Sequence, residues 1–361
     1  MTAPAAFTIY GAGLMGSLLA WRLARQGVKV TLLERAAEHS PQSAAWTAAA
    51  MVAPWAERSA STFDVFRNGE LSLQLWPQLI SELESETGMS CGYQCNGSLV
   101  VAHPADRNEM QQFCDQLSFN GLTPGMSEQV QMLDAASLRE LEPNINAEFR
   151  QAVWLPQEAH LQQRILLTAL WRAARQAGAE LLFETAAEQQ PAQGFILDCR
   201  GTGAAEDIQQ LRGVRGEVLW LESEQRISRP LRLLHPRYHL YLVPKGESGG
   251  RYQYMLGATE IESDDRSPVS VRSAMELLSA LYCLVPAFSE ARIIAFDSNC
   301  RPALPDHNAA IIPFNNAQGL RVNGLFRHGY LQAPALLLKI QQHFGLPLSM
   351  NETYLQEVAC A

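Results

Sequence analysis

Residues Phe7 to Arg35 read FTIYGAGLMGSLLAWRLARQGVKVTLLER, and this stretch decides how the chain begins to fold. A short apolar run leads into Gly11, Gly13 and Gly16. Leucines then recur near a helical period, and a second apolar run ends at Glu34. This order predicts a strand, a glycine turn, a helix and a second strand.

Each part of this stretch suits the phosphates and ribose of a dinucleotide. Gly11 permits a tight turn, Gly13 lets the backbone approach a pyrophosphate, and Gly16 lets the helix pack closely on the strand. Amide groups at the start of the helix can donate to phosphates, and the Glu34 carboxylate can accept from ribose hydroxyls. The pattern therefore predicts a dinucleotide site, but it does not distinguish NAD from FAD.

The composition excludes several classes of protein. The 361 residues suffice for one large domain or two smaller ones, and the 47% that are hydrophobic can form a sizeable core. The net charge of −9 argues against non-specific nucleic-acid binding and against an anionic membrane surface. The first predicted strand begins close to Met1 without a cleavage signal, and no apolar run is long enough to span a membrane. We expect a soluble, cytoplasmic protein.

The seven cysteines are scattered, and Cys91 and Cys95 form the only close pair. No second pair and no histidine cluster accompanies them, so we predict no metal site. Reduced and mostly buried thiols are the better interpretation.

The rest of the chain predicts two interleaved structural parts. An amphipathic helix is expected over Thr62–Thr87, and a second helix over Leu161–Gly178 with a strand directly after it. Short strands and helices are expected between Gly97 and Leu155. Strands of one antiparallel sheet are predicted at 214–222, 238–243, 254–262 and 292–296, with a helix at 270–284.

Three later expectations concern the segments between these elements. The alanine-rich stretch 44–54 is expected to begin a helix. Residues 301–306 are expected to break regular structure, and 326–331 to form a loop before a helix over 332–344. The predicted fold class is α/β, with a Rossmann-like domain and an interleaved α+β domain built on the antiparallel sheet. We assign the first domain to 1–88, 151–212 and 298–361, and the second to 89–150 and 213–297.

Seven segments in one order resemble the D-amino-acid oxidase superfamily, and within it the glycine oxidases of thiamine synthesis. Together they cover nearly the full length of the chain. The resemblance implies bound FAD in a domain of the two-dinucleotide-fold type, a substrate domain, and oxidative deamination of glycine or another small amino acid. The segments are GAGLMG (11–16) with Glu34 and Arg35 after it, AAWTAAAMVAP (44–54), DCRGTG (198–203), LHPRYHLYLVP (234–244), LGATEIES (256–263), RPALPD (301–306) and FRHGYLQAP (326–334).

The resemblance assigns FAD-binding roles to residues spread along the chain. It implies that the ADP half of FAD is bound by Gly11, Gly13, Gly16, Glu34 and Arg35, and that the isoalloxazine ring is lined by Ala49, Ala50 and Met51. It also implies that Gly201 and Gly203 lie near the middle of the cofactor. The pyrimidine edge of the flavin would meet His328, Gly329, Tyr330 and Leu331.

The resemblance also assigns the substrate site. Arg301 matches the arginine that clamps the substrate carboxylate, which a guanidinium can hold in a two-pronged fork. Tyr241 matches a tyrosine beside it, His239 a nearby polar residue, and Arg327 a second arginine of the active site.

Two departures from the family pattern bear on the pocket. Ala50 stands where the family usually has glycine, and residues 306–309 (DHNA) replace a more usual Asp-Gly-hydrophobic-Pro run. The cofactor is therefore better supported than the substrate.

The resemblance implies hydride transfer from the substrate α-carbon to the flavin, reoxidation by oxygen to hydrogen peroxide, and hydrolysis of the imine to a 2-oxo acid and ammonia. No side-chain base is assigned. One alternative is an accessory flavoprotein that oxidises a residue of a partner protein during cofactor maturation, with Trp55, Tyr93 and Tyr252 as exposed aromatics. Another is an NAD-dependent dehydrogenase, which the first stretch alone allows. The sequence leaves open whether the protein forms a homo-oligomer and whether FAD is covalently held.

Overall fold

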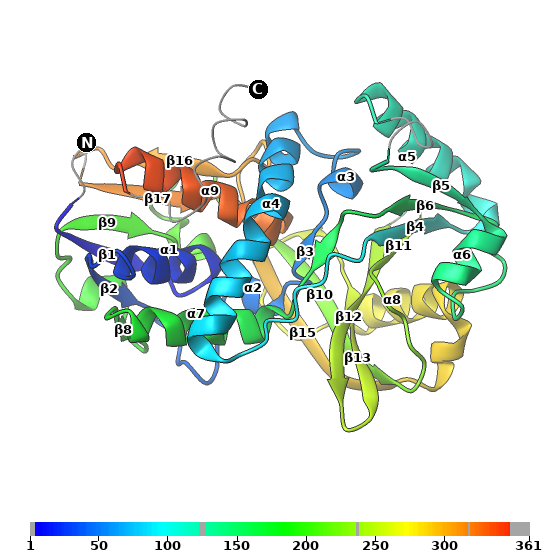
Figure 1. Ribbon diagram of the computed structural model, residues 1–361. Coiled ribbons are helices and arrows are strands. Elements are labelled where there is room, and N and C mark those ends of the chain that lie inside the picture. The colour runs from blue at the N-terminus through cyan, green and yellow to red at the C-terminus, as the bar shows by residue number, and fades with distance from the viewer. Residues whose placement is uncertain (1–3, 123–127, 236–237, 317, 347–361) are drawn as a thin grey trace.

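The structure is a computed structural model that describes residues 4–122, 128–235, 238–316 and 318–346. Two sheets contain most of its strands, and they lie at opposite ends of the molecule (Figure 1). The long helix α4 (Phe63–Thr87) lies between them. It ends at Gly88, whose φ of +69° is the left-handed conformation that commonly terminates a helix.

The smaller sheet has six strands in the order β16-β17-β9-β1-β2-β8. Its neighbours run parallel except for the edge strand β16, which is antiparallel to β17. The strands are β1 (Ala6–Tyr10), β2 (Lys29–Leu33), β8 (Glu180–Leu182), β9 (Phe195–Asp198), β16 (Ala310–Pro313) and β17 (Gly319–Asn323).

Three helices form a layer against this sheet: α1 (Leu14–Ala24), α7 (Gln163–Gln176) and α9 (Gly329–His343). Helix α1 packs on β1 and β2 and contacts both α7 and α9, and α4 also contacts α7 and α9. Every residue of α1 is buried, as expected for a helix that is apolar on nearly all sides. Its one charged residue, Arg22, pairs with Glu82 of α4 at 2.5 Å.

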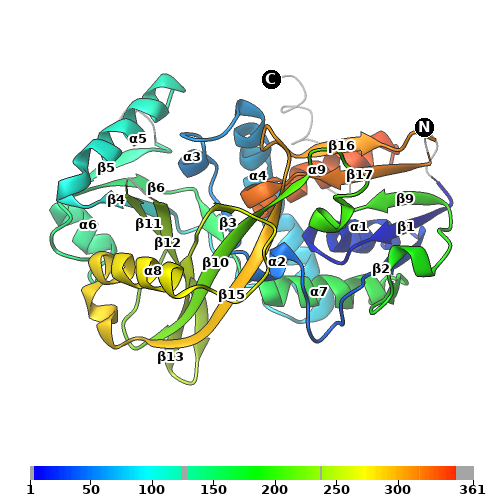
Figure 2. The ribbon, with the colours of Figure 1, turned by 180° about the vertical axis from the view of Figure 1, so that it is seen from behind.

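The larger sheet has nine strands in the order β14-β10-β13-β12-β11-β4-β6-β5, with β15 paired to β10. All neighbours run antiparallel except β11 and β4. Figure 2 shows β10 and β15 as the long pair that reaches from this sheet towards the smaller one. The strands are β4 (Ser98–Ala102), β5 (Gln131–Asp134), β6 (Gln151–Leu155), β10 (Arg212–Ser223), β11 (Leu231–His235), β12 (Tyr238–Ser248), β13 (Arg251–Gly257), β14 (Ile261–Glu262) and β15 (Arg292–Ala303).

Both faces of the larger sheet are covered by other elements. Side chains alternate along each strand, so neighbouring residues of one strand pack into different cores. On β4, Leu99 and Val101 belong to the core that includes α8 (Val271–Leu284), whereas Val100 belongs to the core that includes α5 (Arg107–Phe119). The remaining short elements are α2 (Ala44–Thr47), β3 (Met51–Val52), α3 (Pro54–Glu57), α6 (Ala135–Leu141), β7 (Ala159–His160) and the 3-10 helices η1 (Pro104–Asp106), η2 (Ala187–Gln189), η3 (Gly201–Ala204), η4 (Pro286–Glu290) and η5 (Phe326–His328).

The predicted α/β fold class is confirmed, and so are the helices at 62–87, 161–178 and 270–284 within one or two residues at each end. The domain boundaries stay a prediction. Strand β6, which we assigned to the nucleotide-binding domain, pairs with β4 and β5 in the larger sheet.

Two local predictions are wrong. Residues Arg301 to Ala303 do not break regular structure but continue β15, because β10 pairs with the strand along its whole length. Pro302 is tolerated there because β15 pairs only with β10 and is therefore an edge strand. Residues 326–331 are not a loop, since η5 and the first turn of α9 occupy them. The stretch 44–54 does begin a helix, as expected, but α2 ends at Thr47 because Ala48 is extended, with a ψ of 153°.

No helix among the described residues has the length and apolar character needed to cross a bilayer. No group of three or more His, Cys, Asp or Glu side chains among them is placed to hold a metal. Cys91 is buried and Cys95 is exposed, and Cys300 is the only other thiol fully buried in the described part of the chain.

Candidate active site

A cavity of about 660 Å³ runs from the glycine turn after β1 to the larger sheet. We call the part around Gly11, Gly13, Glu34 and Arg35 the nucleotide end. The part around Glu57, Arg232, Tyr241, Arg301 and Arg327 is the substrate end. The predicted site residues that line the cavity are Gly11, Gly13, Glu34, Arg35, Ala49, Ala50, Met51, Gly201, Gly203, Tyr241, Arg301, Arg327, His328, Gly329, Tyr330 and Leu331.

Two predicted site residues are not among the lining residues. Gly16 lies beneath the turn, where an added Cβ would sit only 2.0 Å from the Gly11 carbonyl oxygen. His239 lies on β12 opposite Leu234, and its side chain falls outside the described residues.

The glycine turn is built so that backbone closes its base and leaves its upper side open. Gly11 has a φ of +93°, and an added Cβ would lie 2.8 Å from the Cys199 carbonyl oxygen. At Gly13 an added Cβ would meet only the Ser43 side chain, at 3.5 Å. The backbone at Gly13 can therefore be approached closely from the cavity.

Glu34 ties this turn to the end of β2. One carboxylate oxygen accepts from the Ala12 amide at 2.8 Å, and the other accepts from the Ala36 amide at 2.9 Å. Helix α1 begins directly after Gly13, and no side chain caps its first amides. These amides remain available as donors towards the cavity.

Three buried polar atoms on the cavity wall have no hydrogen-bond partner among the described residues: Ser43 Oγ, Arg232 Nε and His328 Nδ1. Buried polar atoms in native proteins are nearly always paired. A bound molecule with phosphate and carbonyl groups would supply partners to Ser43, His328 and the uncapped helix amides. The donor set and the open turn fit FAD.

The backbone at 49–51 is held in an unusual conformation. Ala50 adopts a φ of +53°, which costs a residue with a side chain about 1–2 kcal/mol. The ammonium group of Lys245 donates to the carbonyl oxygens of Ala49 and Leu161, at 2.5 Å and 2.9 Å. Burial, together with the charge of Arg164, lowers the pKa of Lys245 to about 7. The positive φ gives a physical reason for the family's glycine at this position.

The start of α9 forms the third wall. Its first residues, Gly329, Tyr330 and Leu331, line the cavity, and no side chain caps the helix. The Tyr330 hydroxyl donates to the Ala45 carbonyl at 2.9 Å, and Trp76 Nε1 donates to the Tyr330 carbonyl at 2.9 Å. Helix α9 is thereby fixed to α2 and α4.

Arg301 enters the substrate end from β15. Its side chain lies across Gly216 of β10, where an added Cβ would be 2.5 Å from Nη2. Its Nη1 donates to the carbonyl oxygen of Thr259 at 3.1 Å. In the described part of the chain, no carboxylate forms an ion pair with Arg301. Burial raises the pKa of Tyr241, although Arg301 and Arg232 act in the opposite direction.

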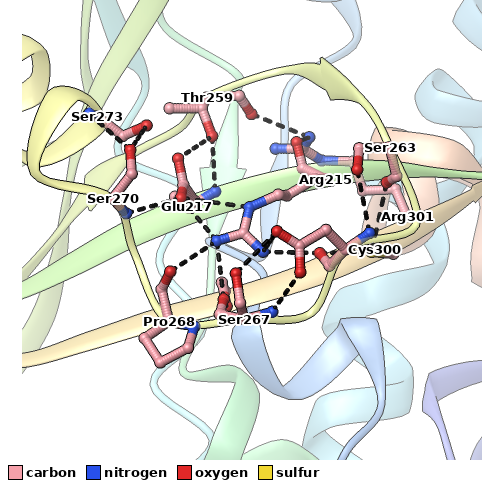
Figure 3. Close-up of polar contacts among 12 residues, drawn as sticks. Arg215, Glu217, Thr259, Ser263, Ser267, Pro268, Ser270, Ser273, Cys300 and Arg301 are labelled. Carbon is pink, nitrogen blue, oxygen red and sulfur yellow. Dashed lines mark hydrogen bonds and ion pairs between the residues drawn. The ribbon is translucent and has the colours of Figure 1, made fainter.

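A polar network beneath Arg301 holds the segment that carries Thr259 (Figure 3). The Thr259 hydroxyl accepts from the Glu217 amide at 2.9 Å and donates to the Glu217 carboxylate at 3.1 Å. The buried Arg215 guanidinium donates to the same carboxylate at 2.8 Å. The segment is thus tied to the sheet at several points, which fixes the Thr259 carbonyl. Arg215 also donates to the carbonyl oxygens of Asp265, Ser267 and Pro268 at 2.7, 2.8 and 2.9 Å.

A buried ion cluster at the substrate end was not predicted. Glu57 of α3 accepts from Arg232 Nη1 at 2.9 Å and from Arg327 Nε at 2.9 Å, and His328 Nε2 lies 3.0 Å from it. Burial alone would raise the pKa of Glu57, but the charges of Arg327 and Arg232, with the hydrogen bond from His328, hold it well below its usual value. Arg327 also pairs with Glu260 at 3.0 Å, and the Glu57 carboxylate raises the pKa of Arg327.

The sequence offered only one hint of this cluster. Arg232 interrupts the apolar run LRLL, and a charged residue in a buried strand usually has a partner. Glu57, Arg232, Glu260 and Arg327 come from four segments without a shared local pattern, so their meeting could not be inferred.

Comparison with known proteins identifies the family. The FAD dependent oxidoreductase family (DAO) matches residues 7–336. The chain belongs to this family. It is 37% identical over 329 residues to a Rhizobium etli protein whose name assigns it to thiamine biosynthesis, the oxidoreductase ThiO; the match covers 91% of this chain and 93% of that protein. It is 25% identical over 351 residues to a glycine oxidase of Bacillus licheniformis, and this match covers 91% of the chain and 89% of that protein.

The fold of the chain also resembles that of glycine oxidases. A crystal structure of glycine oxidase from Bacillus cereus superimposes with a TM-score of 0.80 at 22% identity, covering 95% of this chain and 98% of that one. The protein is therefore an FAD-dependent oxidoreductase related to glycine oxidases, and the predicted cofactor is confirmed. The NAD-dependent alternative is wrong.

Proposed function

We propose that this FAD-dependent oxidoreductase deaminates glycine or another small amino acid. The proposal rests on the position and charge of Arg301. Its guanidinium reaches the cavity on a fixed strand, and no carboxylate of the described residues neutralises it. Such a group in a partly buried site is suited to hold the carboxylate of a small substrate.

The other residues of the substrate end orient this carboxylate. The Tyr241 hydroxyl is protonated at neutral pH, and burial raises its pKa further above the ordinary value of 10, so it can donate to the same carboxylate. Gly216 and Gly257 leave room for these two side chains, since a Cβ at Gly257 would lie 3.1 Å from the Tyr241 hydroxyl oxygen. Arg327 is already paired with two carboxylates and acts as part of the wall.

The cofactor would be held by the residues that line the rest of the cavity. When bound, FAD supplies the acceptor for the two electrons of the amine. Glu34 and the amides after Gly13 would hold its nucleotide half, and the uncapped amides of α9 would donate to the carbonyl edge of its ring. Oxygen as the final electron acceptor, and the release of ammonia and a 2-oxo acid, belong to the same proposal.

The accessory-flavoprotein alternative is not favoured. The aromatic side chains that suggested an exposed docking surface are not exposed: Trp55 is buried, and Tyr93 and Tyr252 are partly buried. Cytoplasmic location stays a prediction from the sequence, which leaves the oligomeric state open.

An anaerobic amine panel tests the proposal directly. Holoenzyme is mixed with glycine, sarcosine or D-alanine, and flavin bleaching is followed by absorbance. We expect bleaching with at least one of these amines and peroxide formation when oxygen is readmitted. A flavin that stays oxidised with every small amine, in a protein that carries its full complement of FAD, would refute the proposal.

A further inference from the structure

The substrate end holds more charged groups than one substrate carboxylate requires. Arg232, Arg301 and Arg327 provide three positive charges, and Glu57 and Glu260 provide two negative charges. One positive charge is left over. The pairing shows where it lies, because Arg232 and Arg327 each have a carboxylate partner, whereas Arg301 has none among the described residues.

Glu57 is fixed in place rather than mobile at the rim. Its side chain is only 12% exposed, and α3 is anchored just before it, where the Ala56 amide donates to the buried Glu158 carboxylate at 2.8 Å. Three donors from Arg232, Arg327 and His328 converge on its two oxygens. The negative charge of Glu57 is therefore a permanent part of the cavity wall.

Arg232 depends on Glu57 for its neutralisation. Its Nη1 donates to Glu57, its Nε has no hydrogen-bond partner among the described residues, and its side chain is 15% exposed. On the sheet, Arg232 pairs in register with Tyr241. The charge of Arg301, like that of Arg232, acts to lower the pKa of Tyr241, so both guanidinium groups lie near this side chain. Without Glu57, the same pocket would present a second free guanidinium close to the one that binds the first carboxylate.

We propose that Glu57 determines the substrate class of this enzyme by neutralising Arg232 and Arg327. The cavity then accepts amines with a single carboxylate and rejects amines with two. A second carboxylate meets no free cation and lies against the charge of Glu57, which is how a site discriminates by repulsion as well as attraction. This inference rests on the proposed function, because it assumes that Arg301 binds the first carboxylate.

The test compares binding of one-carboxylate and two-carboxylate acids to the holoenzyme. Dissociation constants for acetate and malonate are measured from the change in flavin absorbance, so that no turnover is needed. We expect wild type to bind acetate more tightly than malonate. In Glu57→Gln the affinity ratio should shift towards malonate by about tenfold or more, the effect of one charge-assisted hydrogen bond. In the same variant, the rate of iminodiacetate turnover relative to that of glycine should rise.

Two variants separate the role of Glu57 from general charge. Glu57→Gln/Arg232→Gln keeps the local charge balance of wild type and should restore the preference for acetate. Glu260→Gln removes an equal charge from a residue whose side chain is 47% exposed and whose one ion-pair partner among the described residues is Arg327, so it should shift the ratio far less.

Each outcome decides the proposal. An unchanged ratio in Glu57→Gln holoenzyme overturns it, and so does an equal shift in Glu260→Gln. If Glu57→Gln does not yield holoenzyme, wild type and the charge-balanced double variant decide: a preference for malonate in either overturns the proposal, and a preference for acetate in both supports it. Loss of glycine turnover with an unchanged acid ratio would make Glu57 a ligand of the amine, and this also overturns it.

Failure of the proposed function would look different. In that case wild type would not be reduced by glycine, sarcosine or D-alanine. The acetate and malonate measurements would still report the charge selectivity of the cavity.

Discussion

The two ends of the cavity are built in different ways. The nucleotide end is formed by backbone atoms of residues that are close in sequence, with Gly11, Gly13 and Glu34 within one strand–helix–strand unit. The substrate end is formed by charged side chains from five separate segments, with Glu57 and Arg232 as its centre. A site made of backbone can be recognised from local sequence, whereas a site made of balanced charges becomes visible only in the fold.

The largest expected effect tests the backbone-built end. In Gly16→Ala the new Cβ would lie 2.0 Å from the Gly11 carbonyl oxygen, and neither backbone segment can move without separating α1 from β1. We expect a loss of about 3 kcal/mol or more of unfolding free energy, at the upper end for overpacking, together with loss of FAD. Thermal unfolding and the FAD content of the purified protein measure both.

Gly13→Ala is the matched control. Its Cβ would meet only Ser43, at an ordinary distance of 3.5 Å. The protein should fold with nearly the stability of wild-type apoprotein but bind FAD more weakly, because the methyl group enters the cavity wall. If Gly16→Ala unfolds at the wild-type temperature, the close packing of this turn is not what stabilises it.

The second expected effect concerns the free cation of the substrate end. Arg301→Ala removes a two-pronged contact in which each charge-assisted bond contributes about 1.5–3 kcal/mol, so KM for the amine should rise at least about a hundredfold. Arg301→Lys keeps the charge without the fork and should lie between this variant and wild type. Arg272→Ala, at an 86% exposed side chain on α8, is the control. Unchanged KM in Arg301→Ala would remove Arg301 from substrate binding.

The same contrast explains which predictions from sequence succeeded. The β1–α1–β2 unit and α4 follow from local periodicity and from glycines at their ends, so they could be predicted. Strand β11 was missed because it is short and pairs with β4, more than a hundred residues earlier in the chain. The strand at Arg301 was missed because Pro302 argues locally against a strand, and only its pairing with β10 makes it one. The ion cluster at Glu57 was missed for both reasons: its members are far apart in the sequence, and a charged residue such as Arg232 argues locally against a buried position.

The third prediction concerns pH and the support beneath Glu57. Burial raises the pKa of Glu158 from 4.5 to about 7. Between these values the folded protein keeps a proton that the unfolded chain has lost, so this group stabilises fully below pH 4.5 and its contribution is lost as pH rises to 7. Glu158→Gln does not titrate. Relative to wild type, its unfolding free energy should therefore rise by up to about 3 kcal/mol across this range.

Urea unfolding of both proteins at several pH values measures this difference, with excess FAD present throughout. Groups common to both proteins, such as His160, whose pKa burial lowers to about 3, cancel in the comparison. A difference that stays constant from pH 4.5 to 7 would show that Glu158 is ionised in the folded protein.

The smallest expected effect concerns α9, whose first turn reaches the cavity. Pro334 lies inside this helix and has no amide, so the Tyr330 carbonyl lacks its usual partner four residues on. Trp76 Nε1 donates to that carbonyl instead, at 2.9 Å. Trp76→Phe should therefore lower the unfolding free energy by about 1–3 kcal/mol, since it leaves a buried acceptor unpaired.

A double-mutant cycle isolates this hydrogen bond from the change in side-chain volume. In a Pro334→Ala background the new amide can pair with the Tyr330 carbonyl, so the indole donor is no longer required. Trp76→Phe should then destabilise by about 1 kcal/mol less than it does in wild type, because the loss of packing is the same in both backgrounds. Equal effects in the two backgrounds would mean that Trp76 stabilises α9 by packing alone. The N-terminus of α9 would then be positioned by side-chain contacts, as at the substrate end, and not by its backbone.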